Sequence, residues 1–465
     1  MKLQVICPTN NHTERQYVCD VLLGEILGVP AEVVFEERSG VAIEAEGQVL
    51  RLDDTFFSGA AQAWLKPESL PSCELVMADF RNESGIRPTL VERSVPVLFG
   101  RSLPEGRWVT CFDRDCHLGL DVFGSAFYLL SRYEEVVNRT RDKHDRFIAD
   151  YLQPSTACCL ERPIVNEYAE ILWSCMARLW PGLVRKERQF RVMPSHDVDT
   201  VRFWPGKSLS QIAVEGRQVA SRVRSALSLR PLMSWARTKS LGEKHDPYNT
   251  FDRLMQESER RNLRSAFYFI AGHTHAKSDP DYFIDDREIR RLLTTVHEHG
   301  HEIGLHPSYE CYLSQERTGA ELRMLRAVCD EEGITQEVYG SRQHFLRYSH
   351  PETARLCDGL GLTYDTSLGF ADRAGFRCGV CCEFPVYDVI ARRPLRLRER
   401  PLIVMDCTVT DERYMNLGNG ERAFGLIAKL KDRCRMFGGD FTVLWHNSRL
   451  TQPEDWDLYC SVLNH

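Results

Sequence analysis

Short apolar segments that each end in a polar or charged residue recur through the C-terminal part of the chain. RVMPSHD ends at Asp197, HEIGLH at His306, LIVMD at Asp406 and FTVLWH at His446. Segments with helical periodicity lie between them. Buried parallel strands have this composition, and a (β/α) barrel carries its functional groups at the carboxyl ends of its strands. The pattern therefore predicts an α/β fold with a (β/α) barrel in the C-terminal part of the chain.

Two carboxylates lie at the end of the first of these segments, in SHDVD. Asp197 and Asp199 are two residues apart, so their side chains share one face of a strand. One carboxylate can then bind a metal ion while the other accepts a proton from water. Two acids this close are also common in solvated turns, so the pair gains weight only from the other motifs.

Four motifs occur in a fixed order: SHDVD at 195–199, GHEIGLHPS at 300–308, GSRQHFLR at 340–347 and VLWHNS at 443–448. In order and rough spacing they resemble the motifs of polysaccharide deacetylases of the NodB-homology type, a family of metal-dependent carbohydrate esterases. The resemblance begins near Arg191 and implies a distorted (β/α)7-type barrel. The N-terminal part, through GLDVFGSAFYLLSRYEE at 119–135, resembles the extra α/β domain of one subgroup, which is associated with bacterial surface polysaccharide gene clusters.

The resemblance implies a role for each motif residue. Asp197 matches the catalytic base, and Asp199 and His306 match metal ligands. Arg342 matches the arginine that orients the base, because a nearby cation favours the ionised carboxylate and fixes its rotamer. His446 matches the general acid. For Arg342 an ordinary salt bridge, and for His446 a structural role, are the alternatives.

The third metal ligand is open, because the chain departs from the family pattern. The family has a second histidine four residues after the first, where this chain has Glu310. Glu310 could bind the ion itself, since carboxylate oxygens bind zinc and harder cations. His344 is the other candidate, because it shares a strand face with Arg342. We favour His344, and we expect the cofactor to be a divalent metal, Zn²⁺.

Polar and aromatic residues that follow strands are candidates for contact with a sugar. Asp406 ends a strand and either orients His446 or contacts sugar hydroxyls. Trp445 offers a face that could stack on a pyranose ring. The complete set of predicted substrate contacts is Tyr364, Asp365, Asp406 and Trp445.

The chain length and a Pro-Gly break predict the domain organisation. A chain of 465 residues is too long for one ordinary core. Pro181 and Gly182 interrupt it, so we expect an accessory α/β domain over 1–185 and the barrel over 186–465. A basic insertion near 203–246 is expected to be solvated, or to form a lid over the site or a surface for an anionic glycan or membrane headgroups. A second basic run at 391–400 is expected to be solvated or to face the substrate.

Composition restricts the class of protein. A formal net charge of −7 argues against a nucleic-acid partner, and no uninterrupted apolar segment has the length of a membrane span. The N-terminus has no apolar core of signal-peptide length, so we expect a cytoplasmic protein. The 17 cysteines are scattered, which favours reduced thiols over a disulfide framework. The oligomeric state is not predicted.

Together these features predict a metal-dependent hydrolase that removes an N-acyl group, acetyl above all, from an amino sugar in a surface-polysaccharide precursor. Two alternatives stay open. One is a metal-free amide hydrolase of the allantoinase kind, and the other is a catalytically silent glycan-binding or scaffold protein.

Overall fold

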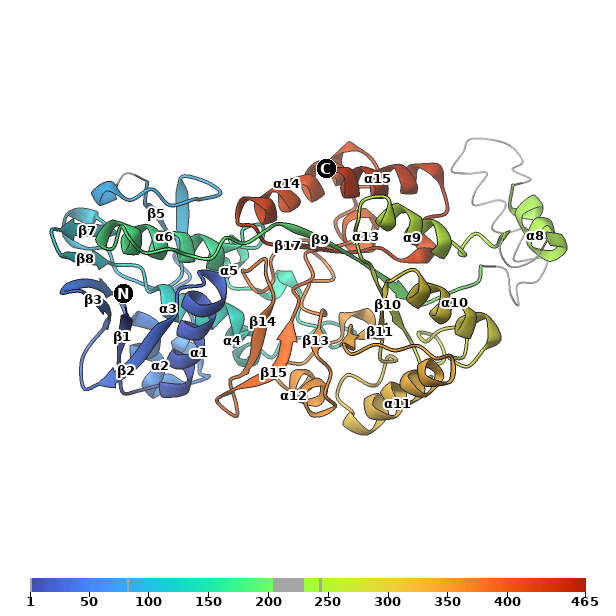
Figure 1. The fold of residues 1–465 in the computed structure, drawn as a ribbon, viewed down its shortest axis with the longest axis horizontal. Helices are drawn as coiled ribbons and strands as arrows, with labels where there is room; N and C mark the ends of the chain where they lie inside the picture. The colour runs from blue at the N-terminus through green and yellow to red at the C-terminus, as the bar shows by residue number, and fades with distance from the viewer. Residues whose placement is uncertain (1, 82, 204–229, 242–244) are drawn as a thin grey trace.

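The computed structural model describes residues 2–81, 83–203, 230–241 and 245–465. Most of the basic insertion expected near 203–246 lies outside these residues, apart from helix α8 (Arg230–Leu241). The described chain is a mixed α/β structure with two large sheets, one in each half of the sequence (Figure 1).

The N-terminal half is built around a six-stranded sheet. Its strands lie in the order β2 (Ala31–Glu36), β1 (Leu3–Pro8), β3 (Val41–Ala45), β4 (Gln48–Leu52), β8 (Asp115–Leu118) and β7 (Val109–Phe112). A separate two-stranded sheet pairs β5 (Val76–Asp79) with β6 (Ser94–Val97). The main helices are α1 (His12–Cys19), continued as a π-helix over Asp20–Ile26, α2 (Thr55–Ala63), α3 (Val122–Leu130), α4 (Tyr133–Val137), α5 (Pro154–Ala157) and α6 (Ile164–Leu179).

The C-terminal half is built around a nine-stranded sheet. Its order is β14 (Phe384–Asp388), β15 (Arg393–Glu399), β13 (Tyr364–Asp365), β12 (Gly340–Ser341), β11 (Glu302–Leu305), β10 (Ala266–Phe269), β9 (Arg191–Val198), β17 (Asp440–Leu444) and β16 (Val404–Met405). All neighbours are parallel except the hairpin β14–β15. Its helices are α9 (Phe251–Glu259), α10 (Arg287–Glu298), α11 (Gln315–Glu331), α12 (Glu352–Gly359), α13 (Asp406–Thr410), α14 (Glu421–Met436) and α15 (Pro453–Asn464).

The strand pattern read from the sequence agrees with this sheet, with two differences. The sheet ends at β14 and β16, and no strand pairing in the described parts of the chain closes it into the expected barrel. The basic run at 391–400 has exposed or half-buried arginines, as expected, but it also contains strand β15, in which Leu395 and Leu397 are buried. The strand is hard to recognise in the sequence because its charged residues alternate with the few apolar residues that face the core.

Five residues that lie in register across the C-terminal sheet pack against one another beneath the predicted site. Asp197, Tyr268, Gly304, Gly340 and Tyr364 are register partners on successive parallel strands. A Cβ atom on Gly304 would lie 2.3 Å from a ring carbon of Tyr268, and one on Gly340 would lie 2.0 Å from Tyr364. The glycines therefore leave room for the two tyrosine rings, whose hydroxyls are 2.8 Å apart.

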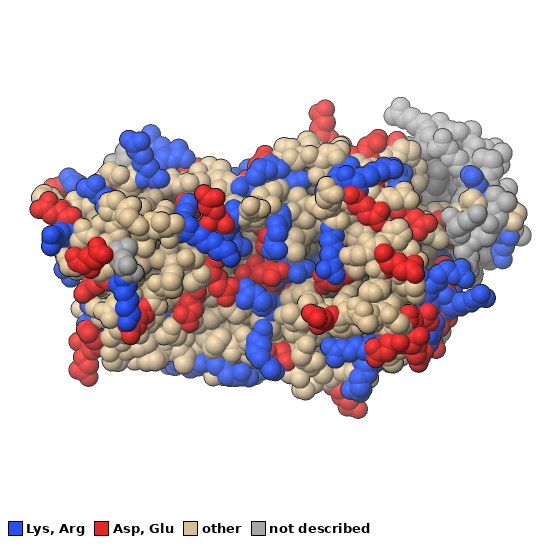
Figure 2. All heavy atoms as spheres, viewed as in Figure 1, with Lys and Arg blue, Asp and Glu red and all other residues tan. Residues whose placement is uncertain are grey.

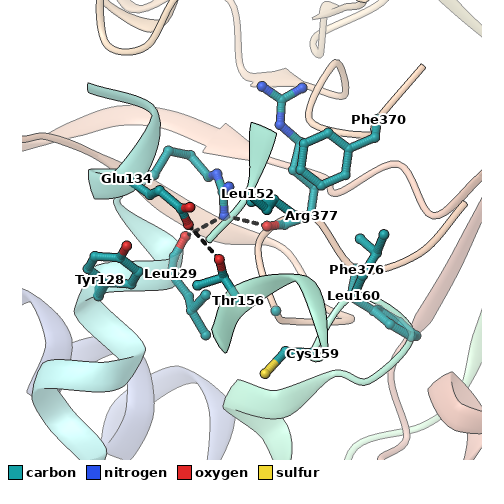
Figure 3. Close-up of a pocket in the computed structure, with 12 residues that line it drawn as sticks. Tyr128, Leu129, Glu134, Leu152, Thr156, Cys159, Leu160, Phe370, Phe376 and Arg377 are labelled. Carbon is teal, nitrogen blue, oxygen red and sulfur yellow. Dashed lines mark hydrogen bonds between the residues drawn. The ribbon is translucent and has the colours of Figure 1, made fainter. Parts of the chain in front are cut away.

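The halves meet at a seam that contains a small cavity (Figure 3). Glu134 and Thr156 from the N-terminal half are joined there by a 2.8 Å hydrogen bond, and Phe370 and Arg377 come from the C-terminal half. Its volume of about 10 Å³ is close to the space one water molecule needs. The cavity is too small for a sugar, so it is not a candidate substrate site.

The cysteines, the helices and the surface charges can be compared with what the composition predicts. Cys111 and Cys116 lie opposite each other in the β7–β8 hairpin and form a disulfide, so the expectation of reduced thiols throughout is wrong for this pair. The other 15 cysteines are free. Among the described residues no helix is both long and apolar enough to cross a membrane. Figure 2 shows basic and acidic side chains interspersed over the visible face.

Candidate metal centre

Three predicted ligands converge at the carboxyl ends of neighbouring strands. Asp199 follows β9, His306 follows β11 and His344 follows β12. His306 Nε2 lies 3.2 Å from Asp199 Oδ1, and His344 Nε2 lies 3.7 Å from the same oxygen. One ligand atom from each of the three lies within 4.8 Å of the others. One carboxylate and two imidazoles form a donor set that suits a catalytic zinc-type ion, which keeps a position open for water or substrate.

Each of the two imidazoles also has a neighbour at its other ring nitrogen, Nδ1. His306 Nδ1 lies 2.5 Å from the carbonyl oxygen of Arg342, an acceptor that requires a proton on Nδ1, so Nε2 is the ring nitrogen that faces Asp199. His344 Nδ1 lies 3.5 Å from Asp279 Oδ1. Asp279 is itself fixed by backbone amides, including that of Tyr309 at 2.8 Å. Carboxylate or carbonyl partners of this kind are typical of metal-binding histidines.

The electrostatics of Asp199 also fit a cation. Its Oδ1 atom is buried and has no hydrogen-bond partner among the described residues. Burial alone would raise the pKa of Asp199, but contact with His306 and the charges of His344 and His446 hold it below its usual range. A buried carboxylate oxygen aimed at two imidazole nitrogens is a site that a divalent ion would satisfy.

Asp197 and Arg342 form a buried pair beside this cluster. Arg342 Nη1 donates to Asp197 Oδ1 at 2.9 Å, and Nη2 donates to Ser195 Oγ at 2.9 Å. Arg342 also donates to the carbonyl and hydroxyl oxygens of Thr366. The other carboxylate oxygen of Asp197, Oδ2, lies 3.7 Å from His306 Nε2. One oxygen of Asp197 is thus fixed by the arginine while the other faces the ligand cluster.

His446 approaches the cluster from β17. Its Nε2 lies 3.6 Å from Asp199 Oδ2, and its Nδ1 lies 2.8 Å from Asp406 Oδ1. Burial would lower the pKa of His446, but the Asp406 carboxylate raises it to about 9. Asp406, Cys407 and His446 form a second group whose ligand atoms lie within 4.8 Å of one another, and burial raises the pKa of the Cys407 thiol well above its usual range.

Three of the predicted substrate contacts are not available to a sugar. Trp445 is 2 % exposed and packs on Tyr459, 5.2 Å between ring centres. Asp365 is buried and accepts hydrogen bonds from Ser341 and from the backbone of Ser367. Both predictions were wrong because alternation turns these side chains to the opposite face of the sheet from their neighbours His446 and Thr366.

Tyr364 does point to the site face, but it is buried in the row beneath the acids. Its hydroxyl contacts Glu302 and Tyr268 rather than open space. Glu310, the alternative third ligand, lies 3.5 Å from Arg347 and is outside the ligand cluster. Of the predicted substrate residues, Asp406 alone contacts a member of the site, His446.

Sequence reasoning missed Asp279 and Ser195. Ser195 could have been found, because it precedes Asp197 by two residues and so shares its face. Asp279 lies in a loop between Phe269 and Arg287 that has no periodic pattern, so nothing in the sequence pointed to it.

Comparisons with known proteins give one family model and several distant solved structures. Residues 3–181 match a family of unknown function (DUF7033). No curated protein matches the chain. A crystal structure of a polysaccharide deacetylase from Mycobacterium smegmatis is 15 % identical, with a TM-score of 0.38 over 60 % of this chain and 84 % of that one.

Two further solved structures are similarly distant. A polysaccharide deacetylase from Pseudomonas aeruginosa PAO1 is 14 % identical, with a TM-score of 0.37 over 61 % of this chain and 86 % of that one. Puue allantoinase is 10 % identical, with a TM-score of 0.35 over 59 % and 83 %. What this chain does therefore has to be inferred from its own side chains, and its place in a subgroup with an extra N-terminal domain stays a prediction.

Proposed function

We propose that the chain is a divalent-metal-dependent hydrolase that removes an N-acyl group, acetyl above all, from an amino sugar. One observation carries the proposal: a cluster of half-buried Asp199 and buried His306 and His344 lies between a carboxylate fixed by an arginine and a histidine fixed by a second carboxylate. Amide hydrolysis needs a polarised carbonyl, a base for water and an acid for the leaving amine, and this arrangement supplies residues for each.

The residues have the following proposed roles. Asp199, His306 and His344 would hold the ion, for which we propose Zn²⁺; when bound, it polarises the acyl carbonyl and makes water acidic enough to ionise near neutral pH. Asp197 accepts the proton of the attacking water at Oδ2, since Arg342 occupies Oδ1. His446 gives its Nε2 proton to the sugar nitrogen as the C–N bond breaks, leaving a carboxylate and a free amine. Asp406 fixes the ring of His446 through Nδ1.

The substrate and setting rest on the motif resemblance. We propose an amino sugar in a cytoplasmic precursor of a bacterial surface polysaccharide, with residues 1–185 as an accessory domain and 186–465 as the catalytic one. The rivals are a metal-free amide hydrolase of the allantoinase kind and a catalytically silent glycan-binding protein.

Metal content and amine release test the proposal together. We expect the purified full chain to bind about one divalent ion, Asp199→Ala to lose it, and Asp197→Asn to keep it while the rate of amine release from an N-acetylated amino-sugar oligomer falls about 10²- to 10⁴-fold. Asp440→Asn is the matched control, because Asp440 is also buried and pairs with an arginine, Arg191, at the opposite end of β9. Metal-free turnover of a ureide would favour the first rival, and sugar binding without turnover the second.

A further inference from the structure

The loop that carries His344 has a backbone that its own residues do not favour. Phe345 and Leu346, directly after His344, have φ angles of 61° and 55°. Residues with a Cβ atom rarely adopt positive φ, and bulky ones persist there only when surrounding contacts hold them. The contacts that hold this loop therefore determine where the imidazole of His344 lies.

Several of those contacts come from the other half of the chain. Arg146 Nη1 donates to the carbonyl oxygen of Phe345 at 3.1 Å. The same guanidinium is fixed by Asp142, whose Oδ2 accepts from Nε at 2.9 Å and from Nη2 at 2.7 Å. Arg146 is buried, so this contact is shielded from water. An arginine fixed by a carboxylate keeps its remaining donors in one direction.

The far side of the loop is held by the same segment. Arg347 Nε donates to the carbonyl oxygen of His144 at 3.0 Å. Its guanidinium lies 3.9 Å from the ring centre of Tyr309 and 4.1 Å from that of Tyr312. His144 Nδ1 lies 2.9 Å from the Tyr309 hydroxyl. Phe345 and Arg347, which both follow His344, are thus tied to residues 142–149.

Contacts before residues 142–149 and at their last residue also join this part of the chain to the C-terminal half. Before them, Glu135 of α4 pairs with Arg377 at 2.6 Å, next to the seam in Figure 3. At their end, the backbone amide of Ala149 donates to Asp372 Oδ1 at 3.0 Å. The segment is therefore fixed to the C-terminal half and can hold the loop in place.

We propose that residues 142–149, here named the clamp segment, position His344 for metal binding, with Arg146 as the main positioning residue. The inference rests on the proposed function, because it assumes that His344 is a ligand. It assigns a task to the N-terminal half: the clamp segment lies inside residues 3–181, the part that matches a family of unknown function. Without the clamp segment, the loop would relax from positive φ and carry His344 away from Asp199.

Metal affinity of the full chain, measured by competition with a chelator for Zn²⁺, tests the clamp. Arg146→Ala should weaken Zn²⁺ binding by about tenfold or more, the range seen when a partner of a metal ligand is removed. The visible absorption of the Co²⁺-loaded variant should change as well, because it reports the ligand set. Arg93→Ala is the control, since Arg93 is in the same half and its side chain is 79 % exposed in a surface ion pair.

Repeating the Arg146→Ala measurement in a Phe345→Gly variant separates a positioning effect from general destabilisation. Glycine adopts positive φ without cost, so in Phe345→Gly the loop needs less support. There, Arg146→Ala should weaken Zn²⁺ binding by less than about threefold. If Arg146→Ala does not fold, Asp142→Asn, which frees the guanidinium, is measured in its place and should weaken binding in the same direction.

The outcomes are distinct. Unchanged affinity and Co²⁺ absorption in Arg146→Ala, or an equal loss in the Phe345→Gly background, would overturn the clamp while leaving the hydrolase proposal intact. Failure of the unaltered chain to bind Zn²⁺ would overturn the proposed function, and the clamp with it.

Discussion

Replacing Arg342 by methionine should destabilise the fold of the C-terminal half even without a metal ion. Arg342 is fully buried, donates to Asp197, Ser195 and Thr366, and lies 4.7 Å from the ring centre of Tyr268. Methionine keeps much of the volume but leaves the Asp197 carboxylate buried without its cation. Removing one partner of a buried ion pair costs about 3–5 kcal/mol, mainly as the desolvation of the remaining charge.

Urea unfolding of the full chain in the presence of a chelator measures this cost, because the ion then contributes nothing. The double variant Arg342→Met/Asp197→Leu removes both charges, so it should recover a large part of the loss, with a coupling free energy of at least about 2 kcal/mol. The urea dependence should keep its slope, since the surface exposed on unfolding is unchanged. A cost under about 1 kcal/mol for Arg342→Met, or additive effects in the double variant, would refute the reasoning.

Three further predictions concern packing, acid stability and metal removal. Gly304→Ala should lower the free energy of unfolding by about 1–3 kcal/mol, because the new methyl group would overlap the Tyr268 ring; thermal unfolding checks this. Burial raises the pKa of Glu135, but Arg377 and a second buried arginine lower it to about 2. Its stabilising contribution of about 3 kcal/mol should therefore be present above pH ~4.5 and disappear as the pH falls towards 2, so Glu135→Gln should have a flatter acid unfolding profile. A chelator should lower the melting temperature of the unaltered chain but not of Asp199→Ala, since only bound metal stabilises the native state.

The sequence predicted the strands and motifs of the C-terminal half well because both depend on short-range patterns. Apolar runs indicated the positions of β9, β11, β16 and β17. Helices α3 and α4 are separated at Arg132, which has a φ of 48°. Arg132 donates to the carbonyl oxygen of Arg377 in the other half of the chain, a contact that local periodicity does not encode.

The errors at the site have a common cause. Asp365 is predicted because it follows a strand, and Trp445 because its ring could stack on a sugar, but each is adjacent to a residue of the site and so faces the other side. His344 and Glu310 could not be separated by spacing alone. Asp279 was missed because the conformation of a loop brings it to His344. The residues around Asp279 have no hydrophobic pattern that predicts this contact.

By itself, the order of residues fixed which functional groups exist and which strand ends carry them, because period-two alternation and parallel pairing are local consequences of covalent geometry. The three-dimensional fold decided which of those groups meet. Asp199, His306 and His344 come together over gaps of about a hundred and of nearly forty residues, and residues 142–149 reach the loop after His344 from the other half of the chain. Such meetings depend on side-chain packing between distant segments, whose energies no local pattern records.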